Sequence, residues 1–263
     1  MSVGNLELSI LWPAFLAGLL VLATHVPLGQ QVLNRGIVFI DLAIAQVAGL
    51  GVTAADALGF EPEGWRVQVA AVTAALIGAV ALTWTERKWA EAQEALIGVL
   101  FVVAACVELL ILANNPHGGE HLKDLLVGQI LWVSTSSLIP IAILYAVALA
   151  VWFGFRGRIG QAGFYILFAL VVTQSVQLVG IYLVFASLIV PALAARRFAE
   201  NYRLGIGYAV GLVGYVVGLA ASSFFDLPTG AVIVVTLLLT FLAAIVISLM
   251  APARWRAAAA PIE

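Results

Sequence analysis

Charged side chains are scarce in this 263-residue chain, where Asp, Glu, Lys and Arg together make up only 10% of the residues. Apolar residues make up 63%, and the mean hydropathy is +1.11. This composition excludes a soluble globular domain and is typical of a helical membrane protein. The single cysteine, Cys106, excludes a disulfide framework and a paired redox thiol motif. The chain also lacks a phosphate-binding loop, so we expect no ATP hydrolysis by this polypeptide itself.

Long polar segments are lacking as well. The two longest polar gaps, Gly59 to Arg66 and Asn114 to Lys123, are too short to form a core of their own. We therefore expect residues 1–263 to form a single transmembrane domain. Met1 to Glu7 lacks the basic region of a secretory signal, and no clear cleavage site follows the next apolar run. We expect that run to be the first span.

Apolar runs of about spanning length recur along the chain, which predicts an all-α, polytopic membrane protein of about nine transmembrane helices. The predicted spans are Leu8 to Val26, Gly36 to Ala57, Val67 to Trp84, Ala95 to Ala113, Leu138 to Phe153, Gly163 to Leu178, Ile181 to Ala194, Ile206 to Phe224 and Pro228 to Met250. The region from Gly163 to Ala194 is either one very long helix or a hairpin that turns near Gln177 to Gly180.

Basic residues fall on one side of the membrane if that hairpin forms. Ten of the twelve then occupy alternate gaps: Arg35, Arg87, Lys88, Arg156, Arg158, Arg196, Arg197, Arg203, Arg254 and Arg256. Only Arg66 and Lys123 lie on the opposite side. Cytoplasmic loops are rich in Lys and Arg, so we expect the N-terminus outside and the C-terminus in the cytoplasm. A single long helix would break this pattern.

Two carboxylates, Asp41 and Glu108, lie inside predicted spans. Such acids are rare in membranes and usually line a polar path or an interior contact. Both are candidate metal ligands at different depths, which suits a cation that moves stepwise and equally suits proton coupling. His25 is a candidate partner of Asp41, because both belong to the cytoplasmic third of neighbouring spans. The alternative is structural: His25 is packed or interfacial, Asp41 pairs with His25 or Arg35, and Glu108 pairs with a polar group such as Gln177.

The loop from Pro116 to Asp124 is the clearest candidate metal site outside the membrane. Its candidate ligands are His117, Glu120, His121 and Asp124. Imidazole and carboxylate are ligands that zinc and similar divalent ions prefer. We assign the loop to the outer side, where an incoming ion or a substrate-delivering protein would arrive. The alternative is an ordinary polar loop whose side chains face water.

The same loop also contains the pattern of an inverted zinc protease, H-x-x-E-H, from His117 to His121. That motif requires a helix that places both histidines on one face, with the glutamate as general base. Gly118 and Gly119 argue against a regular helix. A membrane zinc protease is therefore only a remote alternative.

Three stretches carry a resemblance to a known family. They are QVLNRGIVFIDLAIAQVAGLGV (Gln31 to Val52), VGIYLVFASLIVPALAARRF (Val179 to Phe198) and FDLPTGAVIVV (Phe225 to Val235). With the predicted topology and the approach to the fourth span at Glu94 to Gly98, they resemble the integral permease of zinc and manganese ABC importers. The resemblance extends over most of the chain.

The resemblance implies a permease in the bacterial cytoplasmic membrane that moves a divalent transition metal, zinc or manganese, and performs no chemistry on it. It also implies a homodimer, a separate ATP-binding subunit and an external metal-binding protein. The transported metal is the only ligand expected, with no permanent cofactor. The lipid bilayer is a further expected partner, and nucleic acid is not expected.

This sequence departs from the resembled family at two places. In that family a histidine follows the aspartate of the second span by four residues, whereas here that position is Ala45 and Gln46 comes next. The family also has a cytoplasmic segment of some length after the fifth span that docks on the ATPase. Here Gly154 to Ala162 is short and contains three glycines, which favours a turn, and Thr85 to Glu94 is the other segment of useful size. An ATP-independent carrier or channel and a non-transporting sensor therefore stay open as alternatives.

Overall fold

Ten α-helices and two short 3-10 helices make up the part of the chain that the computed structural model describes, residues 3–61, 64–113, 118–155 and 158–250. The elements are α1 (Val3–Arg35), α2 (Ile40–Ala57), α3 (Trp65–Lys88), η1 (Ala90–Ala92), α4 (Gln93–Leu112), α5 (Gly118–Val127), η2 (Ile130–Trp132), α6 (Thr135–Phe155), α7 (Gln161–Val179), α8 (Ile181–Ala195), α9 (Glu200–Phe225) and α10 (Thr229–Met250). Eight of the helices are long and apolar enough to cross a membrane, and α8 is a shorter apolar helix. Each predicted span corresponds to one of these nine, so the prediction of a polytopic helical membrane protein is confirmed.

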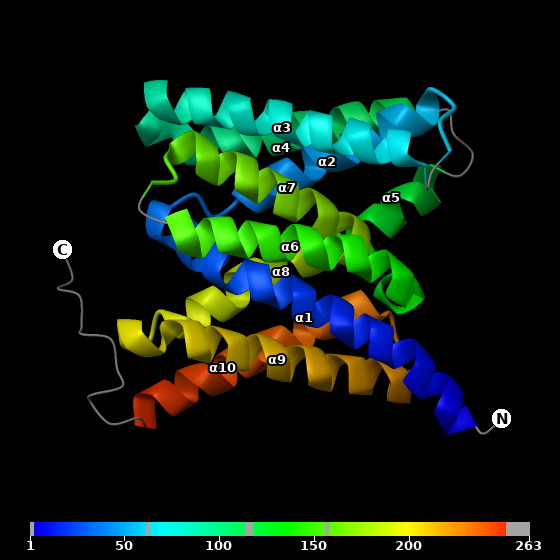
Figure 1. The fold of residues 1–263 in the computed structure, drawn as a ribbon, viewed down its shortest axis with the longest axis vertical. Helices are drawn as coiled ribbons and strands as arrows, with labels where there is room; N and C mark the ends of the chain where they lie inside the picture. Colours follow the sequence, from blue (N-terminus) through cyan, green and yellow to red (C-terminus); the bar gives the residue numbers. More distant parts are fainter. Residues whose placement is uncertain (1–2, 62–63, 114–117, 156–157, 251–263) are drawn as a thin grey trace.

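The helices pack in two groups that lie side by side in Figure 1. In one group, α2 packs against α3 and α4, and α7 packs against α3 and α2. In the other, α1 packs against α8 and α9, and α10 packs against α9 and α8. The short turn between α7 and α8 joins the groups. Large side chains such as Phe164, Phe168 and Tyr145 are completely or almost completely buried in the shared core.

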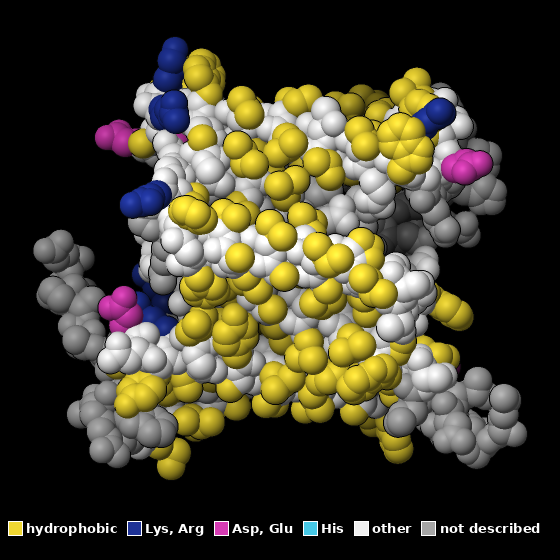
Figure 2. All heavy atoms as spheres, viewed as in Figure 1, with side chains coloured by type: hydrophobic (Ala, Val, Ile, Leu, Met, Phe, Trp, Pro, Cys, Tyr) yellow, Lys and Arg dark blue, Asp and Glu magenta, His cyan; other side chains and the backbone are white. Residues whose placement is uncertain are grey.

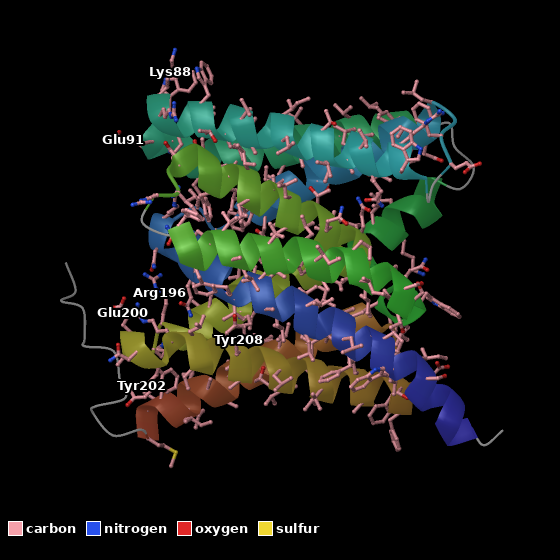
Figure 3. All side chains as sticks on the ribbon, viewed as in Figure 1. Lys88, Glu91, Arg196, Glu200, Tyr202 and Tyr208 are labelled. Carbon is pink, nitrogen blue, oxygen red and sulfur yellow. The ribbon has the colours of Figure 1, made fainter. Side chains whose placement is uncertain are left out.

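The two ends of the bundle differ in their content of charged side chains. Figure 2 shows apolar side chains over the middle of one face and most Lys and Arg side chains at its left edge, and Figure 3 places Lys88 and Arg196 there. We call this end, where α1, α3, α6, α8 and α10 finish, the basic end, and the opposite end the far end. The start of α1 lies at the far end and the end of α10 at the basic end (Figure 1). The described members of the predicted basic cluster lie at this end, whereas Arg156, Arg254 and Arg256 lie outside the described residues.

The region from Gly163 to Ala194 forms the hairpin and not the single long helix. α7 runs to the far end and α8 returns towards the basic end, with Gly180 between them (Figure 1). Gly180 has φ +82° and ψ 161°, a conformation that essentially only glycine adopts. A Cβ on Gly180 would overlap the backbone of Val127, the last residue of α5, and of Gly128, which follows it. This close approach of two backbones fixes the α7–α8 turn against α5.

Candidate functional site

Asp41 lies at the basic end, in the first turn of α2. It is 1% exposed, and neither carboxylate oxygen has a hydrogen-bond partner among the described residues. The positive end of the helix dipole favours a carboxylate at this position. Glu94, at the start of α4, accepts a hydrogen bond from the backbone N–H of Phe39 at 3.3 Å, which brings a second carboxylate to the same helix end. Its Oε2 is also without a partner in the described chain.

His25 is completely buried in α1. Its Nδ1 lies 2.9 Å from the carbonyl oxygen of Val21 and 3.1 Å from the Thr24 hydroxyl, while Nε2 has no partner among the described residues. With the Nδ1–H donated to Val21, Nε2 retains a lone pair that suits a metal. However, α1 packs mainly on α8 and α9 whereas α2 packs on α3 and α4, and His25 and Asp41 are not hydrogen-bonded to each other. A shared site of these two residues stays a prediction.

Glu108 forms a polar cluster with Gln46 and Thr53 of α2. The Gln46 amide donates to Oε2 of Glu108, and the Thr53 hydroxyl donates to Oε1 at 2.8 Å. All three side chains are buried. The alternative pairing of Glu108 with Gln177 is not formed, because Nε2 of Gln177 has no partner in the described part of the chain. Gln46 therefore faces Glu108 and not Asp41.

The outer candidate site lies largely outside the described residues. His117 is not described, and neither are the side chains of Glu120, His121 and Asp124, so their role as metal ligands stays a prediction. The backbone is described from Gly118 onwards and forms α5. The expectation that the two glycines prevent a regular helix is therefore wrong, because the helix begins at Gly118. Within the described residues, no three His, Cys, Asp or Glu side chains come together as a metal site.

The basic end holds a network of polar side chains between helices. Arg35 at the end of α1 lies 3.9 Å from Glu86 of α3, with its guanidinium 4.4 Å from the ring centre of Phe164. Gln93, at the start of α4, donates to the carbonyl of Leu82 and to the Tyr165 hydroxyl. The segment from Thr85 to Glu94 thus divides into the end of α3, η1 and the start of α4, and forms no separate amphipathic helix.

A groove of about 140 Å³ also opens at the basic end, between α1, α6, α8 and α9. Its polar lining consists of Gln30, Asn34, Arg196, Glu200 and Arg203. Figure 3 shows Arg196 and Glu200 close together at this end. The α8–α9 junction therefore presents both signs of charge at one surface.

Sequence reasoning identified Gln46 and Glu108 separately and missed Thr53. The signal was present, because Gln46, Gly49 and Thr53 are spaced by three and four residues and so share one face of a helix. The spacing alone does not show which helix packs against that face. The structure supplies α4 as the partner.

Three comparisons place the chain among known proteins. The sequence profile of the ABC 3 transport family matches residues 7–160 and 153–248. The high-affinity zinc uptake system membrane protein ZnuB of Haemophilus influenzae is 26% identical over 247 residues, which cover 86% of this chain and 93% of ZnuB. The chelated iron transport system membrane protein YfeC of Yersinia pestis is 27% identical over 215 residues, or 74% of this chain and 71% of YfeC. A chain of PsaBC from Streptococcus pneumoniae in complex with Fab has the same fold, with a TM-score of 0.73 at 21% identity over 89% of this chain and 90% of the other.

Proposed function

We propose a mode of action from the premise that this chain belongs to the ABC 3 transport family. It is the transmembrane subunit of a metal ABC importer, resides in the bacterial inner membrane, and is not an enzyme. The alternative of a membrane zinc protease is therefore wrong. The related permeases are named for zinc in one case and for chelated iron in another, so the cargo is a divalent transition metal.

The observation that carries the proposed mode of action is a set of buried polar groups at successive depths of α2, with Asp41 about 120–140° around the helix axis from Gln46 and Thr53. Asp41 lies near its basic end, Gln46 about 7 Å further along the axis, and Thr53 about 18 Å from Asp41 at 1.5 Å per residue. Glu108 of α4 contacts the face of α2 that carries Gln46 and Thr53, and not the face that carries Asp41. A membrane interior offers a cation no water, so carboxylate and amide oxygens at successive depths lower the barrier to its passage. In this path the metal passes from Glu108 to Asp41.

The basic end faces the cytoplasm, because short cytoplasmic loops carry most Lys and Arg. The N-terminus then lies outside, the C-terminus lies in the cytoplasm, and metal enters at the far end. The permease works as a homodimer with a separate ATP-binding subunit and an external metal-binding protein. The ATP-binding subunit docks on the groove that Arg196, Glu200 and Arg203 line, since the Gly154 to Ala162 segment leaves only a short connection between α6 and α7.

The decisive experiment measures ATP-dependent uptake of ⁵⁴Mn²⁺ and ⁶⁵Zn²⁺ into liposomes that contain the permease and its ATP-binding subunit. We expect uptake only with ATP, and at least tenfold slower uptake for Asp41→Asn, which keeps the side-chain shape and removes the charge. Thr240→Val, a change on α10 away from α2, is the control. Metal flux without ATP would support the carrier alternative instead. No flux under either condition would support the sensor.

The same assay separates the remaining candidate ligands. His25→Ala tests the imidazole of α1, and the double change His117→Ala and His121→Ala tests the outer loop. A slower uptake at low metal concentration alone is expected for the loop variant, because the loop would act before the metal enters the membrane. If Asp41→Asn and both histidine variants transport normally, the assigned sites are wrong while the transport function stands.

A further inference from the structure

The polar cluster of Glu108, Gln46 and Thr53 lies in the half of the bundle near the far end. Glu108 is fifteen residues beyond the first residue of α4, or about 22 Å along the helix axis, and four residues before its last. Thr53 is likewise four residues before the end of α2. The cluster is therefore separate in depth from Asp41, which lies in the first turn of α2.

Glu108 carries a carboxylate that only neutral groups contact. It is 1% exposed, and its two oxygens accept hydrogen bonds from an amide and a hydroxyl. No Lys, Arg or His of the described chain forms an ion pair with it. A buried negative charge without a counter-charge is strongly unfavourable. Hydrogen bonds orient such a carboxylate but do not neutralise it, whereas a proton or a bound cation does, so the arrangement suits a cation that binds in exchange for a proton and then dissociates.

Gly49 leaves room for a methyl-sized group beside the carboxylate. Gly49 lies between Gln46 and Thr53 on the same face of α2, and a Cβ placed there would be 3.7 Å from Oε1 of Glu108. The same Cβ would be 3.8 Å from the side chain of Leu125 in α5. The position that a Cβ on Gly49 would occupy therefore lies between Glu108 of α4 and Leu125 of α5, and glycine keeps it free of a side chain.

We propose that Glu108, Gln46 and Thr53 form an all-oxygen binding site for the transported divalent cation, outside Asp41 on the path, that reduces the usual affinity advantage of Zn²⁺ over Mn²⁺. This proposal rests on the proposed transport function. Rotation of the Gln46 amide about its last bond exchanges its nitrogen for its oxygen. The cation then meets a carboxylate oxygen, an amide oxygen and a hydroxyl oxygen. Such oxygen ligands suit Mn²⁺, whereas Zn²⁺ favours imidazole and thiolate.

The test is equilibrium binding of ⁵⁴Mn²⁺ and ⁶⁵Zn²⁺ to the full chain in lipid nanodiscs. Glu108→Gln keeps the size of the side chain and an acceptor for Thr53 but removes the charge, so we expect Mn²⁺ affinity at this site to fall at least tenfold. The double variant Glu108→Gln with Gln46→Glu moves the carboxylate across to α2 and should restore Mn²⁺ affinity to within about threefold. A merely structural role would not produce this rescue.

Two further variants test the ligand set and the space. Gln46→His introduces an imidazole and should shift the ratio of Zn²⁺ to Mn²⁺ affinity at least tenfold towards zinc. Gly49→Ala adds a methyl group that packs without overlap, so the protein should fold normally and lose Mn²⁺ binding. The matched control is Thr236→Val, which removes a buried hydrogen bond of 2.7 Å to the carbonyl of Gly214 between α10 and α9. It should leave both affinities unchanged.

Two results would overturn the site. One is wild-type Mn²⁺ affinity in Glu108→Gln, and the other is an unchanged metal preference in Gln46→His. Failure of the transport function gives a different result, since the wild-type permease with its ATP-binding subunit would then move neither metal into liposomes. The failure of the site and the failure of the transport function can therefore be told apart.

Discussion

The turn between α7 and α8 should tolerate no side chain at Gly180. Its φ of +82° with ψ 161° lies in a region that residues with a Cβ avoid, and the strain there is about 1–3 kcal/mol. A Cβ would also meet the backbone nitrogen of Gly128 and the carbonyl carbon of Val127, which are backbone atoms that cannot rotate away. Such overpacking adds about 1–3 kcal/mol. Gly180→Ala should therefore lower the free energy of unfolding by about 2–6 kcal/mol.

Thermal unfolding of the purified protein in detergent, followed by tryptophan fluorescence, measures this loss. At about 2–4 °C per kcal/mol for a chain of this size, we expect the Tm of Gly180→Ala to fall by about 4–24 °C. Gly98→Ala is the matched control, because Gly98 lies within α4 and a Cβ there would meet nothing within 4 Å. Its Tm should stay the same or rise slightly, as alanine favours a helix. If Gly180→Ala melts within about 1 °C of wild type, the positive-φ conformation of Gly180 and its backbone contact do not exist as described.

The remaining predictions concern orientation and packing. Cysteine labelling tests the orientation in a Cys106→Ala background. Lys88→Cys at the basic end should react with a membrane-impermeant maleimide only after cell lysis, whereas Glu61→Cys at the far end should react in intact cells. The reverse pattern would refute the proposed orientation. Tyr215→Phe removes a buried hydroxyl that lies 2.8 Å from the Ser187 hydroxyl, so we expect a loss of about 1 kcal/mol. A double-mutant cycle with Ser187→Ala checks it, and strictly additive losses in Tm would show that the two hydroxyls do not interact.

The amino-acid sequence by itself determined the class of protein, the positions of the spans and the charge difference between the two ends. Each of these depends on properties that are local in the chain. The span from Ile40 to Ala57 is helical because an apolar segment in lipid must satisfy its own backbone hydrogen bonds. Arg35, Lys88 and Arg196 are separated by whole spans, so their alternation predicted a common end once the hairpin at Gly180 was assumed.

Only the tertiary structure decided which buried polar groups meet. Periodicity places Gln46 and Thr53 on one face of α2, but any of several helices could have faced them, and the structure selects α4 and Glu108. The helix α5 was likewise missed, because two glycines disfavour a helix locally and tertiary packing offsets this preference. Which helix packs against a given face of α2 depends on how all the helices pack together. The candidate cation site at Glu108 depends on that packing and not on any single segment.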